Sequence, residues 1–160
     1  MPMVGTAVDI LLVEDNPADI RLTQEAMRDS KLINKLNVVR DGVEAIEYLR
    51  RLGKYSTARR PDIILLGLNL PKMDGREVLE EIKKDEALKS IPVVILTTSE
   101  AEMDIIRSYN AHANCYISKP VAFEKFARVI SVIENFWFTI VKLPSMSDRE
   151  ELRLQSTMKN

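Results

Sequence analysis

Four polar residues that could hold a metal ion and a phosphoryl group each adjoin a short apolar segment of the chain. Glu14 and Asp15 follow one such segment, Thr97 ends another, and Lys119 follows a third, directly before Pro120. Neighbouring carboxylates repel each other unless a cation lies between them, and Mg²⁺ suits them because it takes oxygen ligands and often joins a phosphate. A lysine and a hydroxyl opposite the acids are suited to hold phosphoryl oxygens. Each residue alone is an ordinary surface or loop residue, so the chemistry depends on whether the fold brings the four together.

The elements that must position these residues alternate between short apolar segments and segments with helical spacing. The apolar segments, which are typical of parallel strands buried on both faces, are residues 7–13, 36–40, 62–66, 92–96 and 115–118. Strands that alternate with helices predict a parallel sheet with helices on both faces, so we expect a five-stranded, doubly wound α/β domain. In such sheets the carboxyl ends of the strands share one edge, where ligands bind. The four polar residues fall at that edge, which favours a joint site.

Capping residues predict the ends of the intervening helices. Asn16 followed by Pro17 is expected to begin the first helix, Asp41 to begin the second and Gly53 to end it. The remaining helices are predicted at residues 75–89, at a capping box of Ser99 and Glu102, and from residue 121 to about residue 141.

Composition and length bound the class of protein. The 160 residues, 46% of them hydrophobic, suit one domain with a short appendage, and a compositional break near Pro144 predicts a polar tail over residues 144–160. A formal net charge of −1 gives no general attraction to nucleic acid or to anionic membranes. The single cysteine excludes an intramolecular disulfide and fits a reducing compartment. Without a basic leader or an apolar stretch near the roughly 20 residues of a membrane span, we expect a cytoplasmic protein.

The sequences around the strand ends, taken together, resemble the receiver domain of two-component response regulators. The matching segments are Ile10–Asn16, Pro61–Leu66, Leu70–Gly75, Val94–Thr97 and Lys119–Pro120. The resemblance runs from residue 8 to about residue 140 and implies a flavodoxin-like receiver domain over residues 6–143, with an extended last helix. It implies a function in a phosphorelay, in which a histidine kinase phosphorylates the domain. The domain then signals through protein–protein contacts and is not itself an enzyme.

The end of the chain narrows this resemblance. Residues 134–144 are similar to the small single-domain regulators that partner cyanobacterial phytochromes. This similarity implies a phytochrome or a related histidine kinase as partner, and a homodimer. Independently, Phe136, Trp137 and Phe138 are consecutive and span roughly 200° of a helix, which is more than one domain core can cover. At least one should contact another surface, either the folded-back tail or, as we expect, a dimer or partner interface.

The receiver resemblance also implies a role for each matching site residue. The Mg²⁺ ligands would be Glu14, Asp15 and the backbone carbonyl of Asn69. The residues that bind the phosphoryl group would be Thr97 and Lys119. The switch that changes the output surface would consist of Thr97 and Tyr116, and the peptide bond before Pro120 would be cis.

One position departs from the family pattern, because Gly67 stands where the family has its phosphoacceptor aspartate. The alignment holds on both sides, since Thr97 lies 30 residues and Lys119 lies 52 residues after Gly67, and both are receiver spacings. Glycine offers no nucleophile for phosphoryl transfer, and a metal site would lose one oxygen ligand and one negative charge. We therefore predict that the chain is not phosphorylated at the family site and that Mg²⁺ binding is weakened.

Neither acid near Gly67 is a good substitute for the missing aspartate. Asp62 lies at the far end of the strand, about 16 Å away at about 3.3 Å per residue, and Asp74 belongs to the family's ordinary loop motif. Three interpretations of Gly67 stay open. It is a change in an otherwise working regulator, the mark of a natural pseudo-receiver, or a strand glycine beside which a backbone passes closely.

Two other functions compete with phosphorelay signalling. The first is an interaction module of the same fold that binds its partners without phosphorylation. The second is an enzyme such as a metal-dependent phosphatase, but such an enzyme would need a nucleophile at a strand end, and none is visible. Nucleotide binding is disfavoured because the sequence has neither a Gly-x-Gly-x-x-Gly turn nor a Gly-x-x-x-x-Gly-Lys loop.

Overall fold

The computed structural model describes residues 7–29, 33–97, 115–119 and Glu124. For Cys115, Tyr116 and Ser118 the description covers the backbone alone. Three predicted elements therefore lie outside the described residues: the helix that begins near Ser99, the extended last helix apart from Glu124, and the polar tail over residues 144–160.

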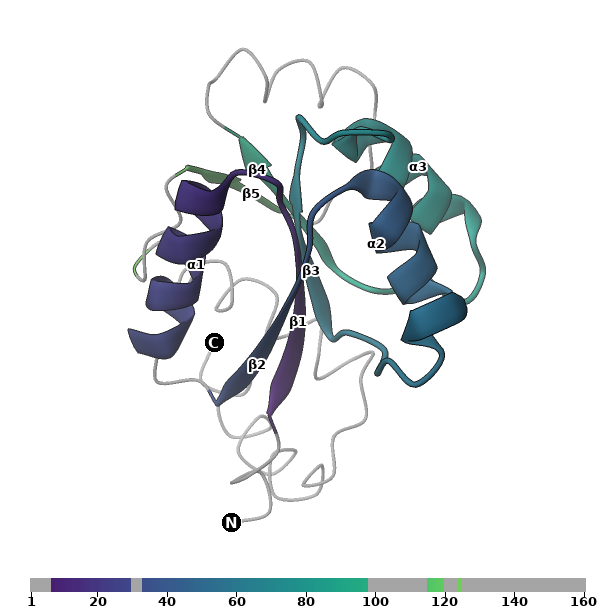
Figure 1. Ribbon diagram of the computed structural model, residues 1–160, viewed down its shortest axis with the longest axis horizontal. Coiled ribbons are helices and arrows are strands. Elements are labelled where there is room, and N and C mark those ends of the chain that lie inside the picture. Colours follow the sequence, from purple (N-terminus) through teal and green to yellow (C-terminus); the bar gives the residue numbers. More distant parts are fainter. Residues whose placement is uncertain (1–6, 30–32, 98–114, 120–123, 125–160) are drawn as a thin grey trace, which may run out of the picture.

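Parallel strands form a sheet with the order β2-β1-β3-β4-β5 (Figure 1). The strands are β1 (Val8–Val13), β2 (Asn34–Val39), β3 (Ile63–Gly67), β4 (Val93–Thr97) and β5 (Cys115–Ser118). Strands β1 to β4 begin and end within two residues of their predicted segments. The register places Gly67 opposite Leu96, and Thr97 opposite Ser118. The carboxyl ends of neighbouring strands therefore meet at one edge of the sheet.

Helices cover both faces of this sheet. Helix α1 (Pro17–Asp29) lies on one face, whereas α2 (Gly42–Leu49) and α3 (Gly75–Lys84) lie side by side on the other (Figure 1). A short 3₁₀ helix, η1 (Gly53–Tyr55), follows α2. The predicted doubly wound parallel α/β fold is thereby confirmed. No helix in the described part of the chain is long and apolar enough to cross a membrane.

Two layers of buried side chains form the core, one on each face, because successive strand residues point to opposite sides of a sheet. On one face, strand residues such as Leu66 and Ile95 pack with Val78 of α3. On the other, Leu65 packs in a cluster that includes Ile20 of α1. Every residue of β3 and β4 is buried, as expected for strands covered on both sides. The polar residues Glu14, Asp15 and Lys119 directly follow the strands that carry this double layer.

Side-chain caps begin the helices at the predicted places. Asn16 accepts a hydrogen bond from the backbone of α1 at 3.0 Å, and Asp41 accepts one from the backbone of α2 at 2.7 Å. The predicted end of α2 at Gly53 is wrong. Helix α2 ends at Leu49, because Arg51 already adopts the left-handed backbone with a φ of 57°. Gly53, with a φ of 54°, instead begins η1.

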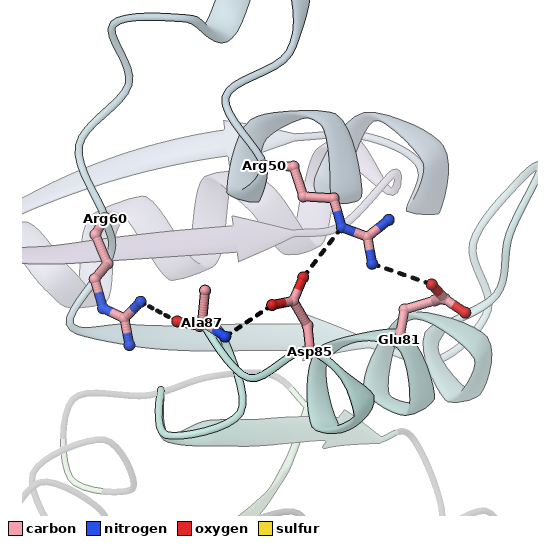
Figure 2. Close-up of polar contacts among 5 residues, drawn as sticks. All are labelled: Arg50, Arg60, Glu81, Asp85 and Ala87. Atoms are coloured by element: carbon pink, nitrogen blue, oxygen red, sulfur yellow. Dashed lines mark hydrogen bonds and ion pairs between the residues drawn. The ribbon is translucent and has the colours of Figure 1, made fainter.

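Helix α3 ends at residue 84, before the predicted end at residue 89. The carboxylate of Asp85 accepts a hydrogen bond from the backbone N–H of Ala87 at 2.8 Å, and this local bond competes with continuation of the helix. Figure 2 shows the same carboxylate paired with Arg50 at 3.3 Å, while Arg50 also contacts Glu81 at 3.2 Å. Arg60 donates to the carbonyl of Ala87 and holds the turn from its other side.

Candidate functional site

The candidate site lies at the carboxyl edge of the sheet. Glu14 and Asp15 follow β1, Gly67 ends β3, Thr97 ends β4 and Lys119 follows β5. The backbone N–H of Lys119 donates to the carbonyl of Thr97 at 2.7 Å, which joins the end of β5 to the end of β4. The structure thus brings together the positions that the sequence analysis singled out, and the side-chain geometry shows what they do to one another.

Glu14 is a buried acid at the centre of this site. Only 2% of the residue is exposed, and its Oε1 lies 2.7 Å from the Nζ of Lys119. Its Oε2 accepts a hydrogen bond from the backbone N–H of Asn16 at 3.0 Å. Burying a carboxylate is costly unless it is paired with a cation and hydrogen-bonded, and both conditions hold here. Within the described part of the chain, the Lys119 ammonium is the one partner of Oε1.

Lys119 is held between two acids. Its side chain is 14% exposed, and its Nζ lies 3.1 Å from Oδ2 of Asp19, in the first turn of α1. Burial alone lowers the pKa of Lys119, but the hydrogen bonds and charges of Glu14 and Asp19 outweigh burial and raise that pKa above its ordinary value. The lysine is therefore a fixed cation. Sequence reasoning missed Asp19, and the one available signal was its place as an acid in the first turn of the helix after the acidic pair.

Gly67 leaves a space that a neighbouring side chain fills. A Cβ atom at this position would lie 2.7 Å from Oε1 of Glu14 and 3.2 Å from the carbonyl oxygen of Val13. The carboxylate of Glu14 thus occupies the volume into which a side chain at position 67 would project. The carbonyl of Val13 is closer than most neighbours of a real Cβ atom, so the interpretation of Gly67 as a structural strand glycine stays open.

The metal ligands implied by the receiver resemblance do not form an open site in this arrangement. Glu14 is paired with Lys119, Asp15 is partly exposed and Asn69 is exposed. Among the residues that the structure describes, no group of three or more histidine, cysteine or acidic side chains is placed to hold a metal ion. As arranged, the donor set does not fit a divalent cation, because its buried carboxylate already has a cation as its partner.

The two other acids near β3 have structural partners of their own. Asp62 precedes β3 at the opposite edge of the sheet, where its Oδ2 accepts a hydrogen bond from the backbone N–H of Asp9 at 2.8 Å. Asp74 begins α3, and its carboxylate accepts a hydrogen bond from the backbone N–H of Glu77 at 3.0 Å. Each of these acids therefore has a backbone partner at its own place in the fold, away from Gly67.

The remaining residues singled out from the sequence are described less fully. Thr97 is buried, with 1% of the residue exposed. Tyr116 lies in β5, but its side chain is outside the description, and so are Pro120 and the aromatic residues 136–138. Their roles as switch, cis peptide and interface stay predictions.

Known proteins resemble the chain over most of its length. It is 49% identical to the response regulator Rcp1 of Synechocystis sp. over 136 residues, which cover 85% of this chain and 92% of Rcp1. The solved structure of the phosphorylated cyanobacterial phytochrome response regulator RcpA is 54% identical, with a TM-score of 0.69, and the match covers 87% of this chain and 99% of that one. The Mn²⁺-bound form of Rcp1 is 48% identical, with a TM-score of 0.67, over 86% of this chain and 99% of that one.

The family model of the response regulator receiver domain matches residues 10–131 of the chain. That match covers strands β2 to β5 and all of β1 except its first two residues, and it ends beyond Lys119. The parallel α/β fold, the polar residues at the strand ends and the similarity to Rcp1 and RcpA all lead to one assignment. The chain belongs to the response-regulator receiver domain family, and within it resembles the regulators of cyanobacterial phytochromes.

Proposed function

We propose that this chain is a two-component receiver domain that signals through protein–protein contacts and is not phosphorylated at the family position. The observation that carries the proposal is Gly67 at the end of β3, in register with the end of β4. Phosphoryl transfer to a receiver needs a carboxylate nucleophile at this position, and glycine has none. The carboxylate of Glu14 fills the same space but is bound to Lys119, so it is a poor substitute as a nucleophile.

The proposed partners follow from the relatives and from the sequence. Because RcpA is a phytochrome response regulator, we propose that a histidine kinase, such as a phytochrome, binds this chain in the cytoplasm. Thr97 and Tyr116 would shift the population of output surfaces. Nucleic acid and membranes are not proposed as partners, because the net charge of −1 favours neither.

Metal binding is proposed to be weak. A relative, Rcp1, has been solved in a Mn²⁺-bound form, and the groups that this chain would offer to Mg²⁺ are Glu14, Asp15 and the carbonyl of Asn69. Loss of the acceptor carboxylate at Gly67 and the pairing of Glu14 with Lys119 both act against it.

The test is phosphorylation by a small-molecule donor. The chain and its Gly67→Asp variant are incubated with acetyl phosphate and Mg²⁺, and their intact masses are measured. We expect no phosphoryl adduct on the parent chain, because no nucleophile stands at the end of β3. We expect an adduct on the variant, because Thr97 and Lys119 are already in place at the same edge.

A Gly67→Asn variant is the matched control, since asparagine has the size of aspartate without its nucleophilic charge. It should stay unmodified under the same conditions. An adduct on the parent chain would contradict the proposal and indicate another acceptor. Modification of neither the parent nor the aspartate variant would favour a natural pseudo-receiver that signals without phosphate.

The alternative function is an interaction module that never uses a phosphoryl group. The ion pair between Glu14 and Lys119 favours it, because the positive charge of the lysine that would bind the phosphoryl group is already balanced by an acid of the same chain. This alternative predicts that binding to a cognate kinase has the same Kd with and without acetyl phosphate and Mg²⁺. In the Gly67→Asp variant, a change of this Kd on addition of acetyl phosphate would distinguish phosphorelay signalling from the interaction module.

A further inference from the structure

Three groups compete for one small volume beside Gly67. The Oε1 atom of Glu14 lies 2.7 Å from the Nζ of Lys119, and it also lies 2.7 Å from the place where a Cβ of residue 67 would be. A real Cβ does not approach an oxygen that closely, so any side chain at position 67 must displace the Glu14 carboxylate. The displaced group is the far end of a flexible side chain and can rotate away, while the backbone carbonyl of Val13, 3.2 Å from the same place, must give by only a few tenths of an ångström.

We propose that Gly67 acts on divalent metal binding through Glu14. With glycine at position 67, the Glu14 carboxylate occupies the acceptor's place and pairs with Lys119, so a divalent cation must compete with an internal ammonium for that carboxylate. A side chain at position 67 sets the carboxylate free for the metal. This inference concerns the same pocket as the proposed function, but it requires no phosphorylation.

The surroundings of the ion pair make this competition severe. Glu14 and Lys119 have side chains that are 3% and 14% exposed, so solvent screens their attraction only weakly. Lys119 has a second acid partner, Asp19, at 3.1 Å, and that contact holds the ammonium next to Glu14. A metal ion that recruited Glu14 would leave the lysine with Asp19 as its remaining described partner. The Lys119 ammonium is therefore an internal cation that already occupies the Glu14 carboxylate.

The decisive experiment is a titration of Mn²⁺ into the chain and its Gly67→Ala variant, followed by calorimetry or by the electron paramagnetic resonance signal of free Mn²⁺. Alanine adds a Cβ but no metal ligand. If glycine merely lacks a ligand, alanine lacks it as well and cannot improve binding. We expect Gly67→Ala to bind Mn²⁺ about tenfold more tightly, the equivalent of about 1.4 kcal/mol. Equal or weaker binding by the alanine variant would overturn the proposal.

A double-mutant cycle assigns the effect to Glu14. The Glu14→Gln variant keeps the size of the side chain and removes its charge, so it should bind Mn²⁺ weakly. In that background Gly67→Ala should no longer change the Kd, because no carboxylate remains to be released. The same tenfold gain in both backgrounds would show that alanine acts through some other group, and the proposal would fail.

A second route avoids any change in the strand. The Lys119→Gln variant removes the internal cation and should raise the affinity for Mn²⁺. Its matched control is Lys72→Gln, because Lys72 is an exposed lysine in the loop between β3 and α3 that pairs with Asp41 at 3.6 Å. If both variants gain equally, the change reflects net charge alone and the proposal is wrong. No titration contains a phosphoryl donor, so these results stand apart from the phosphorylation test.

Discussion

At the scale of single residues, a second pair of acids lies at the amino edge of the sheet, opposite the candidate site. Asp9 is 5% exposed and pairs with Nε of Arg59 at 3.2 Å, while Asp62 accepts a hydrogen bond from the backbone of Asp9. Burial and the charge of Asp9 raise the pKa of Asp62, against the opposing effects of that hydrogen bond and of the nearby arginines. The charged form of Asp62 is therefore unfavourable in the folded chain.

The raised pKa of Asp62 leads to a prediction about pH. A carboxyl group whose pKa is raised by folding stabilises the fold below its unfolded pKa, and this contribution is lost as the pH rises through the folded pKa. Asp62→Asn keeps an acceptor oxygen without the charge. It should raise the free energy of unfolding at pH 7 by less than about 1 kcal/mol, the range of a partly screened charge pair. Urea unfolding should show the gain shrinking toward pH 4.

The exposed Glu47 supplies the control for that measurement. Glu47→Gln removes one negative charge without relieving a buried one, so it should change stability less than Asp62→Asn does. If Asp62→Asn destabilises the chain at pH 7, then its charge is favourable in the fold and the prediction is wrong.

The contents of the site could be predicted in part from the sequence. Glu14, Thr97 and Lys119 could be placed at one edge, because the carboxyl ends of parallel strands meet there. Asp19 could not be placed, because its contact with Lys119 depends on how α1 packs against the sheet. The Glu14 side chain points into the space that is open because Gly67 has no Cβ atom. The spacing of residues in the sequence does not predict that direction.

At the scale of elements, two glycines allow loops and helices to approach each other closely. A Cβ at Gly42, the first residue of α2, would lie 1.9 Å from the carbonyl oxygen of Met73 in the loop after β3. A Cβ at Gly75, the first residue of α3, would lie 2.2 Å from the carbonyl oxygen of Gly67. In both cases the neighbour is backbone, which cannot rotate away as a side chain can. These contacts fix the loop between β3 and α3 beside the site.

Gly75→Ala and Gly67→Ala should therefore differ in cost, although both add one methyl group. Gly75→Ala must move the backbone of β3 and should lower the free energy of unfolding by about 1–3 kcal/mol, as overpacking does. Gly67→Ala meets mainly the end of the Glu14 side chain and should cost less. Chemical denaturation of the two variants beside the parent chain is the measurement. Equal losses would mean that the backbone contact at Gly75 relaxes freely.

The end of a helix could be predicted where a side chain caps it. It could not be predicted where the backbone conformation or a distant contact ends the helix. Asn16 and Asp41 begin helices because their oxygens accept backbone hydrogen bonds, which is a property of residue type. Helix α2 ends through a left-handed Arg51, a conformation that arginine rarely adopts. The end of α3 depends on Asp85 and on its contact with Arg50, which follows α2 and is far away in the sequence. Sequence spacing alone therefore predicted too long a helix.

At the scale of the whole molecule, the proposed homodimer makes a prediction about association. If Phe136, Trp137 and Phe138 lie in the helix predicted from the sequence, one domain core would not cover all three, since consecutive helical residues point in directions about 100° apart. A buried aromatic side chain often contributes about 2 kcal/mol to the free energy of association at an interface. Replacing the critical one with serine should then weaken dimerisation by more than about tenfold. Sedimentation equilibrium of the parent and of three single serine variants measures this.

Circular dichroism of each serine variant is the control, since its helical signal should match that of the parent chain. Three variants that all sediment like a dimeric parent would remove these aromatics from the interface. A parent chain that is monomeric at every concentration would instead favour the tail as the cover of this surface, which was the other interpretation of the same residues.

The strand order has a consequence for self-association of a different kind. β2 stands at one end of the sheet, and no strand of the described part of the chain pairs with its outer side. The outer backbone groups of such a strand can pair with a strand from another molecule. Its sequence begins Asn34-Lys35, and Lys35 is exposed. If a fibre grew by pairing β2 of one molecule with β2 of the next, the charged lysine would lie against its own copy, and the two charges would repel each other. Lys35 is thus placed to oppose amyloid-like growth through β2.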